Sequence, residues 1–159
     1  MKELSPEIMS AYLAGIIDGE GCISLVYHKP KKGRINNSIF IKVRVGNTSP
    51  DLILRLSEWW PESRVYPHKR KKGHKQSWSW MTSTRSSSIK FLRFILPYLC
   101  IKKTQARLVL TYFSSTRRCC GSTVPEEEID KRHRFVMIMK KLNQRGIPGE
   151  LKEAQDSLS

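Results

Sequence analysis

Residues 13–21, with the sequence LAGIIDGEG, close the first segment of the chain that has a strong helical pattern. That segment begins at Ser5, whose hydroxyl can cap a helix, and Pro6 suits the first helical position. Residues 8–18 have the composition of a buried helix, and Gly19 is expected to end it in the left-handed conformation. The stretch therefore predicts a helix whose carboxyl end carries two acidic side chains.

One face of this helix carries almost no side chain. Ala11, Gly15 and Gly19 recur every four residues, and such a stripe lets two backbones approach closely. Because the chain contains one copy of the stripe, the simplest partner is the same helix of a second subunit about a two-fold axis. Tight packing against an internal strand or helix is the alternative that the residues leave open.

Glu20 lies where a carboxylate is locally unfavourable. The carboxyl end of a helix is the negative end of its dipole, and Asp18 adds a second negative charge nearby. A divalent cation would relieve both, and Mg²⁺ held by Glu20 could activate water and neutralise a leaving oxygen in phosphodiester cleavage. A capping or salt-bridging acid is the alternative reading of this residue.

Two pairs of alternating segments follow, and each pair predicts a β-hairpin. Apolar and polar residues alternate over residues 22–28 and 38–47, and again over residues 64–70 and 75–82. In the last segment Trp78 and Trp80 share one face, which we expect to be buried. Further helices are predicted at residues 52–60, 87–96, 104–114 and 126–144. This order predicts an α+β domain in which a four-stranded antiparallel sheet carries its helices on one face.

Charge is segregated along the chain. Lys and Arg number 29 against 14 Asp and Glu, and the net charge is +15. No acid occurs over residues 21–50 or 63–125, although both stretches are rich in Lys and Arg. A surface that needed charge only for solubility would intersperse both signs. The segregation therefore indicates a polyanionic partner, with nucleic acid favoured over an anionic membrane surface.

Length and composition limit the class of protein. A chain of 159 residues with 39% apolar residues suits one packed core, and we expect a single domain over residues 1–145 with a tail over 146–159. No apolar run approaches the ~20 residues of a membrane span, which excludes membrane-spanning proteins. Four cysteines without CxxC spacing indicate free thiols in a reducing, intracellular compartment. A zinc site of Cys119, Cys120 and His133 is conceivable, although its spacing fits no standard ligand pattern.

Residues 13–21 resemble the signature of the LAGLIDADG homing endonucleases, and the order of elements over residues 5–145 is similar to that family. Residues 99–106, with the sequence LCIKKTQA, stand at the distance expected for a second family segment. A single signature in a short chain resembles the homodimeric branch of the family. The resemblance implies a site-specific double-strand DNA endonuclease that cleaves a long, near-palindromic target with Mg²⁺, for which Mn²⁺ or Ca²⁺ could substitute.

The resemblance also implies roles for individual residues. Glu20 takes the place of the metal-binding catalytic carboxylate, and Gly21 would supply a backbone carbonyl near the same metals. Lys102 matches the active-site lysine, for which an ordinary phosphate contact is the alternative. Asn47 falls where the family keeps a polar residue that organises solvent.

Two acids are placed less simply by the resemblance. Asp18 matches the first acid of the signature, which serves the helix end and the dimer interface. Asp51 departs from the family pattern, which often has a basic residue nearby. Arg55 is the candidate to take over that function, and the alternative is that no residue does.

Outward-facing residues of the two hairpins are predicted to read bases in the major groove, which a two-stranded ribbon can enter. They are Ser24, Val26, His28, Lys32, Arg34, Ser38, Phe40, Lys42, Arg44, Tyr66, His68, Arg70, Lys75, Ser77 and Ser79. Arg44, Arg70 and Lys42 are the best candidates for guanine contacts. Phosphate contacts are expected from Lys69, Lys71 and Lys72.

Two other functions are compatible with the same scaffold. One is an intron RNA-binding maturase, since the family includes members that assist splicing, and the other is a DNA-binding protein that has lost cleavage. The presence of both Glu20 and Lys102 favours the enzyme. The resemblance further implies an organelle, chloroplast or mitochondrion, as the location, with the bacterial cytoplasm as the alternative.

Overall fold

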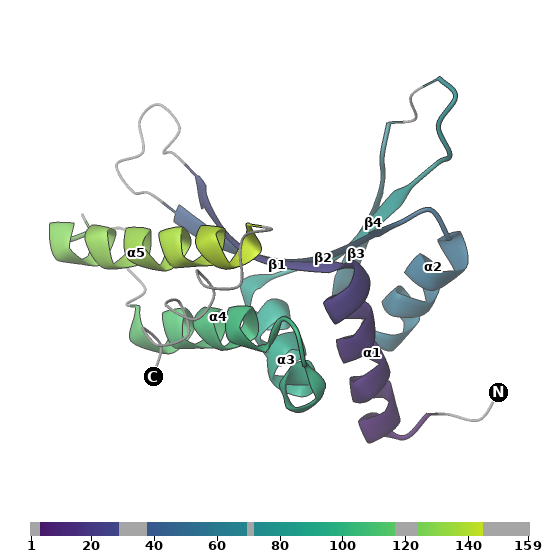
Figure 1. Ribbon diagram of the computed structural model, residues 1–159, viewed down its shortest axis with the longest axis horizontal. Coiled ribbons are helices and arrows are strands. Elements are labelled where there is room, and N and C mark those ends of the chain that lie inside the picture. The colour runs from purple at the N-terminus through teal and green to yellow at the C-terminus, as the bar shows by residue number, and fades with distance from the viewer. Residues whose placement is uncertain (1–3, 29–37, 70–71, 117–123, 145–159) are drawn as a thin grey trace. The chain divides into compact units, whose positions relative to one another are not determined.

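The computed structural model describes residues 4–28, 38–69, 72–116 and 124–144, and at His28 and Ser38 it describes the backbone alone. In chain order the elements are α1 (Pro6–Glu20), β1 (Gly21–His28), β2 (Ser38–Asn47), α2 (Pro50–Trp59), β3 (Ser63–Pro67), β4 (Trp78–Thr82), α3 (Arg85–Ile95), the 3₁₀-helix η1 (Leu96–Tyr98), α4 (Lys103–Ser115) and α5 (Glu126–Asn143). The four strands form one antiparallel sheet in the order β1-β2-β4-β3 (Figure 1). This confirms the predicted α+β class. Within the described residues, no helix combines the length and apolar character needed to cross a membrane.

The chain forms two compact units, each built from segments that are distant in sequence. The first unit contains Met1–Ile23 and Lys42–Lys103, and the second contains Ser24–Ile41 and Thr104–Ser159. A single domain over residues 1–145 stays a prediction, and the predicted tail over 146–159 lies outside the described residues.

Helix α1 begins as its sequence predicts and ends differently. The Ser5 hydroxyl accepts a hydrogen bond from the Ile8 amide at 3.3 Å, with Pro6 in the first turn. The prediction that Gly19 ends the helix in the left-handed conformation is wrong, because α1 continues to Glu20 and passes directly into β1. The glycine that the junction requires is Gly21, where an added Cβ would lie 2.7 Å from the Ile17 backbone. The helix therefore ends by close backbone approach and needs no left-handed residue.

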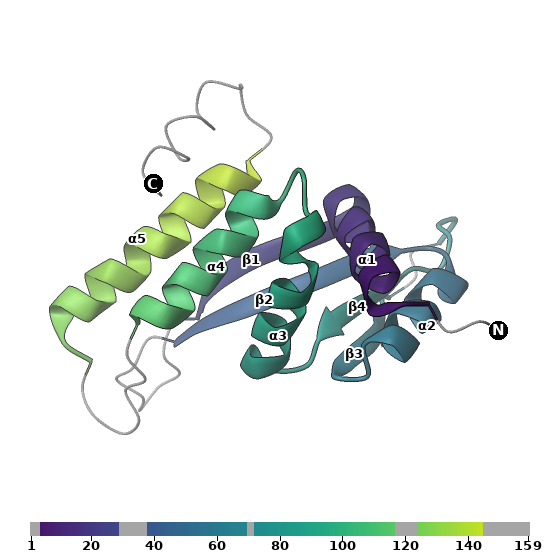
Figure 2. The ribbon, with the colours of Figure 1, turned by 90° about the horizontal axis from the view of Figure 1, so that it is seen from below.

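The core of the first unit lies between the strands and helices α2 and α3. Helix α2 packs on β3 and β4, α3 packs on β4, and α1 packs against α3 (Figure 2). Trp80 is fully buried, lies opposite Val45 on β2 and Val65 on β3, and packs on the Phe91 ring at 5.2 Å. Its predicted burial is confirmed. Trp78, expected to share that burial, stays partly exposed because it stands at the start of β4.

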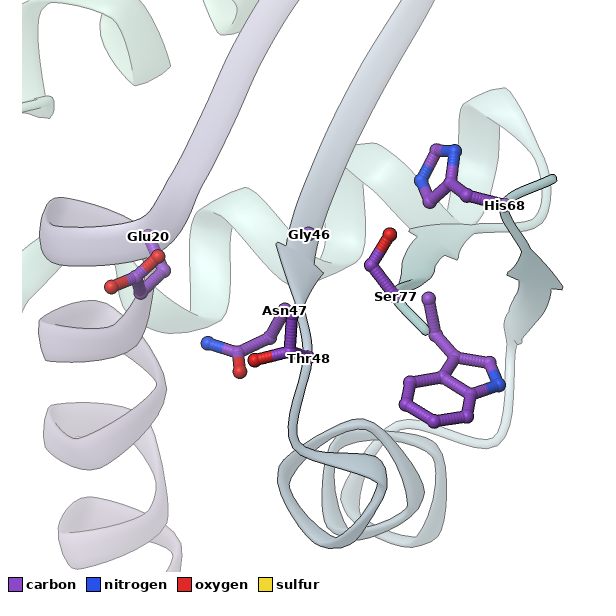
Figure 3. Close-up of a pocket in the computed structure, with 7 residues that line it drawn as sticks. Glu20, Gly46, Asn47, Thr48, His68 and Ser77 are labelled. Carbon is purple, nitrogen blue, oxygen red and sulfur yellow. The ribbon is translucent and has the colours of Figure 1, made fainter. Parts of the chain in front are cut away.

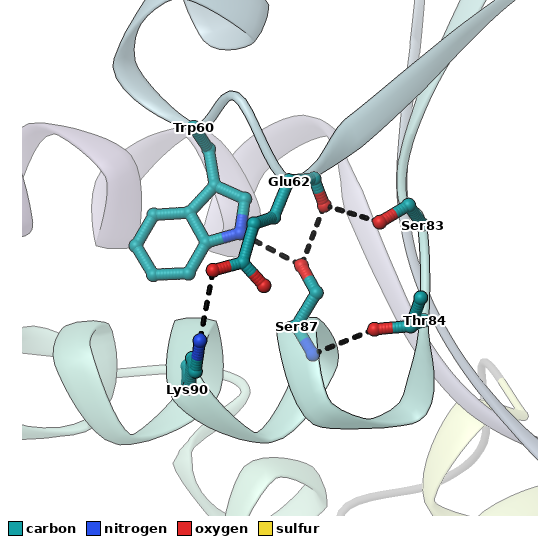
Figure 4. A network of polar contacts seen from close by, with 6 residues as sticks. All are labelled: Trp60, Glu62, Ser83, Thr84, Ser87 and Lys90. Carbon is teal, nitrogen blue, oxygen red and sulfur yellow. Dashed lines mark hydrogen bonds and ion pairs between the residues drawn. The ribbon is translucent and has the colours of Figure 1, made fainter.

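A polar network holds the chain between α2 and β3 to the start of α3 (Figure 4). The Glu62 carbonyl oxygen accepts hydrogen bonds from the hydroxyls of Ser83, at 2.9 Å, and Ser87, at 2.5 Å. The Trp60 indole donates to Ser87 at 3.0 Å, and Lys90 pairs with the Glu62 carboxylate at 2.9 Å. These bonds hold the end of the β3–β4 pair where Ser63 pairs with Thr82, and the opposite end of the pair supplies one wall of the pocket described below.

The second unit contains α4 and α5. Gln105 on α4 donates to the Leu142 carbonyl of α5 at 3.3 Å, and the rings of Tyr112 and Phe135 pack at 5.5 Å. Lys131 donates to the Ser115 carbonyl at 2.7 Å, which ties the start of α5 to the end of α4. Both helices match the predicted residues to within one position at each end.

Candidate active site at the carboxyl end of α1

A pocket of about 490 Å³ lies in the first unit, where three separate segments meet. Its lining residues are Glu20 from the end of α1, Gly46, Asn47 and Thr48 from the end of β2, and His68, Ser77 and Trp78 from the base of the β3–β4 hairpin. Figure 3 shows Glu20 on one side and His68 on the other, with Asn47 between them. The structure thus brings together two residues predicted to be catalytic, Glu20 and Asn47.

Asn47 lines the pocket, and no described group accepts a hydrogen bond from its side-chain NH₂. Its side-chain oxygen accepts a hydrogen bond from the Ser49 amide at 2.9 Å, just before α2. That bond leaves the side-chain NH₂ group to face the pocket, and in Figure 3 the nitrogen points toward the side that carries Glu20. An amide held in this way can donate to water or to a phosphate oxygen.

Asp18 and Lys102 form a reciprocal latch between α1 and the segment that leads into α4. The Asp18 carboxylate accepts hydrogen bonds from the amides of Cys100, Ile101 and Lys102, at 2.7, 3.1 and 2.8 Å. The Lys102 ammonium donates in return to the carbonyls of Ile17, at 2.9 Å, and Asp18, at 2.5 Å. A cation at these last carbonyls also offsets the negative end of the helix dipole.

The latch changes the electrostatic argument for a metal. Asp18, which the sequence placed beside Glu20 as an uncompensated charge, is stabilised by hydrogen bonds from three backbone amides. In the described part of the chain, Glu20 has neither a hydrogen-bond nor an ion-pair partner, and its side chain is exposed at the pocket. The case for a cation therefore rests on Glu20.

A cation at Glu20 would need ligands beyond this set of side chains. Among the described residues, no three His, Cys, Asp or Glu side chains gather closely enough to hold a metal ion. An exposed carboxylate without a partner, with oxygen and amide groups nearby, suits the hard cations Mg²⁺ and Ca²⁺, which usually keep several water ligands. The residues present thus fit a divalent cation that also binds water and phosphate. Cys119 and Cys120 of the conceivable zinc site lie outside the described residues.

The stripe of small residues on α1 is exposed. Helix α1 turns Ser10, Leu13, Ala14 and Ile17 inward, and leaves Ala11, Gly15 and Gly19 on its open face. A Cβ built on Gly15 or Gly19 would meet no other described segment within 4 Å. Large apolar residues flank the stripe, since Ile8 is 56% exposed and Tyr12 is 52% exposed. Packing against another described segment is therefore not the reason for these glycines.

Neither Asp51 nor Arg55 lines the pocket. Asp51 is exposed in the first turn of α2. The Arg55 guanidinium pairs with Glu58 at 2.9 Å and lies over the Trp59 ring at 5.8 Å, and that ring packs edge-on against Tyr12 at 5.1 Å. Arg55 therefore belongs to the surface beside the exposed face of α1.

The predicted DNA-reading residues fall into three groups. Phe40, Arg44, Tyr66, His68 and Lys75 are exposed, and Ser24, Val26, Lys42 and Ser77 are partly exposed. Ser79 is only 5% exposed, because His68 covers it with a hydrogen bond of 2.7 Å between Nε2 and the Ser79 hydroxyl. Lys32, Arg34 and Arg70, with Lys71 of the predicted phosphate contacts, lie outside the described residues, as do the side chains of His28 and Ser38.

Three pocket residues escaped sequence reasoning. Gly46 and Thr48 flank Asn47, and Trp78 was assigned to the core. The interruption of the β2 alternation at Gly46 is the signal that could have marked an opening, because a glycine inside a strand often marks a close approach.

No family model matches the chain, and no curated protein matches its sequence. Solved structures match its fold. The homing endonuclease I-CvuI in complex with a DNA target is 19% identical, with a TM-score of 0.70 and 96% of each chain covered.

Two further structures extend the likeness. The archaeal intron-encoded homing endonuclease I-Vdi141I complexed with DNA is 12% identical, with a TM-score of 0.66, over 97% of this chain and 98% of that chain. The LAGLIDADG homing endonuclease I-SmaMI bound to cleaved DNA is 17% identical, with a TM-score of 0.59, and 99% of this chain matches 49% of that one. The chain therefore has the fold of the LAGLIDADG homing endonucleases.

Proposed function

We propose that the chain is a site-specific double-strand DNA endonuclease that hydrolyses phosphodiester bonds with a divalent cation. The observation that carries the proposal is the state of Glu20. It is the single acid that lines the pocket, and no described group pairs with it. In a chain of net charge +15, an unpaired carboxylate beside hydrogen-bond donors suits a site where metal and phosphate meet.

The residues at and beside the pocket have different roles in the proposed hydrolysis. Glu20 would hold the cation, together with the Gly21 carbonyl, and Mg²⁺ bound there, or Mn²⁺ in its place, would activate water and neutralise the leaving oxygen. The Asn47 amide donates to the attacking water or to a phosphate oxygen. Lys102 acts as a positioning residue, because its ammonium is committed to the α1 carbonyls next to Glu20.

Double-stranded DNA is the substrate that the charge and the fold support best. Exposed Arg44 and Lys75 lie on the hairpin strands and loop of the first unit, and no acid occurs over residues 63–125. The similar structures I-CvuI and I-Vdi141I are complexes with DNA. Such a chain would gain affinity from phosphates and sequence selectivity from the exposed side chains of its strands.

The test is selection followed by cleavage. A pool of duplexes with a randomised central segment is bound by the protein in Ca²⁺, and the retained duplexes are then incubated with Mg²⁺. We expect near-palindromic sequences to be enriched and cut on both strands, with no cutting in EDTA. Retained sequences that stay intact in Mg²⁺ and Mn²⁺ would indicate a DNA-binding protein without nuclease activity. Retention of intron RNA in preference to any duplex would indicate a maturase.

We further propose that two copies assemble through the open face of α1. The small residues Ala11, Gly15 and Gly19 would allow the two helices to approach closely, and exposed Ile8 and Tyr12 would add apolar contact. A two-fold axis at this face brings both copies of Glu20 near one another. One Glu20 would then serve each strand of the duplex.

Gly15→Leu is expected to abolish the dimer without destabilising the subunit. Leucine would block close approach of two helices, whereas within one subunit a Cβ at this position meets no other described segment within 4 Å. Leucine is also the better helix former, by about 0.8 kcal/mol relative to glycine. Analytical ultracentrifugation at micromolar concentration should show a monomer whose helical circular dichroism is unchanged. A dimer that survives Gly15→Leu would contradict this interface, and Thr111→Leu on the exposed side of α4 controls for the added surface leucine.

A further inference from the structure

His68 is held in place through its backbone and its ring. Its amide donates to the Ser77 carbonyl at 2.9 Å, and its carbonyl accepts from the Gln76 side chain at 2.8 Å. The ring nitrogen Nε2 lies 2.7 Å from the Ser79 hydroxyl oxygen. With Nε2 committed to Ser79, Nδ1 is the nitrogen that the exposed ring can offer to a ligand at the pocket.

Among the described groups, the Ser79 hydroxyl has one hydrogen-bond partner, the His68 ring. Ser79 is 5% exposed and lies between Gly46 on β2 and Tyr66 on β3. Glycine at position 46 offers no side-chain acceptor, and the Ser79 oxygen is among the atoms nearest to a Cβ built there, at 4.0 Å. Within the described chain, His68 is the sole hydrogen-bond partner of this hydroxyl.

The direction of this hydrogen bond determines the tautomer of the neutral His68 ring. A buried O–H without an acceptor is costly, whereas an unused lone pair on the same oxygen is tolerated more readily. The hydroxyl therefore donates to Nε2, and a neutral imidazole must carry its proton on Nδ1. If the ring is protonated, both nitrogens carry a proton. In either state Nδ1 is a hydrogen-bond donor.

We propose that the hydrogen bond with Ser79 keeps Nδ1 of His68 a hydrogen-bond donor, and that this donor contacts the edge of one DNA base. Nδ1–H can donate to purine N7, guanine O6 or thymine O4 in the major groove, and it finds no acceptor on cytosine, which presents an amino group there. The pair thus selects against cytosine at one position of the half-site. In this arrangement Ser79 positions the His68 ring, although the strand pattern had predicted that Ser79 contacts a base directly. The inference rests on the proposed function, since it presumes a DNA substrate.

The tautomer is tested without DNA. In protein labelled with ¹⁵N-histidine, two-bond ¹H–¹⁵N spectra distinguish a protonated Nδ1 from a protonated Nε2, and His68→Gln identifies the His68 signals by their loss. We expect the Nδ1–H form in the native chain and in Ser79→Thr, which keeps the hydroxyl, and its loss in Ser79→Ala. An Nε2–H tautomer in the native chain would overturn the inference whether or not the protein binds DNA.

Base selection is tested by binding to duplexes that carry each base at the contacted position. The native chain and Ser79→Thr should bind cytosine about tenfold more weakly than the preferred base, a difference of about 1.4 kcal/mol, and Ser79→Ala should reduce that ratio to about one. Ser114→Ala in α4 is the matched control, because among the described residues the Ser114 hydroxyl bonds only to its own helix. If His68→Ala weakens binding equally for all four bases, the acceptor is a phosphate and base reading is refuted. If no variant binds any duplex, the proposed function fails while the tautomer measurement stands.

Discussion

Glu20→Gln is expected to lower the rate of DNA cleavage by a factor of about 10³ or more and to leave DNA binding intact. Glutamine keeps the shape of the side chain and removes the charge that would hold the cation. Glu20 has no partner in the described part of the chain, so its replacement breaks no contact that holds the fold. The free energy of unfolding should change by less than about 0.5 kcal/mol. Removing a negative charge from the carboxyl end of a helix acts in the stabilising direction.

The measurement is single-turnover cleavage of the selected duplex, with binding followed in Ca²⁺ on the same protein. Glu7→Gln is the matched control, because it makes the same change at the opposite end of α1, where Glu7 is exposed. It should cleave at the native rate. Undiminished cleavage by Glu20→Gln would remove the carboxylate from the mechanism, and loss of DNA binding would show that its role is not specific to the chemical step.

Asp18→Ala is expected to lower the free energy of unfolding by about 3 kcal/mol. The carboxylate accepts three amide hydrogen bonds at 2.7–3.1 Å from the segment that leads into α4. Hydrogen bonds to charged groups contribute about 1.5–3 kcal/mol each, and partial exposure reduces that sum because water can replace the lost acceptor. For a chain of this length the melting temperature should fall by roughly 6–12 °C.

Thermal and urea unfolding at one fixed protein concentration measure the effect, since any self-association makes the melting temperature depend on concentration. Asp18→Asn keeps an acceptor oxygen without the charge and should lose about half as much. Asp51→Ala is the control, because Asp51 is an exposed helix-end acid whose only expected contribution is the helix dipole, below about 1 kcal/mol. Equal losses from Asp18→Ala and Asp51→Ala would show that the latch contributes nothing specific.

Local chemistry made the start of helices and the faces of strands predictable. Ser5 caps α1 as the sequence predicts, and Ser49 caps α2 by the same chemistry, because each hydroxyl accepts a hydrogen bond from the amide three residues ahead. On β4 the alternation of side chains identified Trp80 as core. These features depend on residues that are neighbours in the chain, so their geometry follows from spacing alone.

Two predictions failed where neighbouring segments intervene. Gly19 was expected to stop α1, but the helix runs on until Gly21 meets the Ile17 backbone. Ser79 was expected to face DNA, because its strand position points outward. The His68 ring, from the other strand of the hairpin, lies over it. Spacing along one strand cannot show that a side chain from the next strand will cover it.

The two acids at the end of α1 show which properties follow from the chain itself and which follow from tertiary packing. Residues 13–21 by themselves determined a helix that delivers two carboxylates into an otherwise basic chain, because charge and helical period are properties of the sequence. They could not distinguish a structural acid from a free one. Asp18 accepts hydrogen bonds from amides 82 to 84 residues away, whereas no described group pairs with Glu20 at the pocket. Which carboxylate meets those amides depends on how distant segments pack, and that packing is set by the whole core.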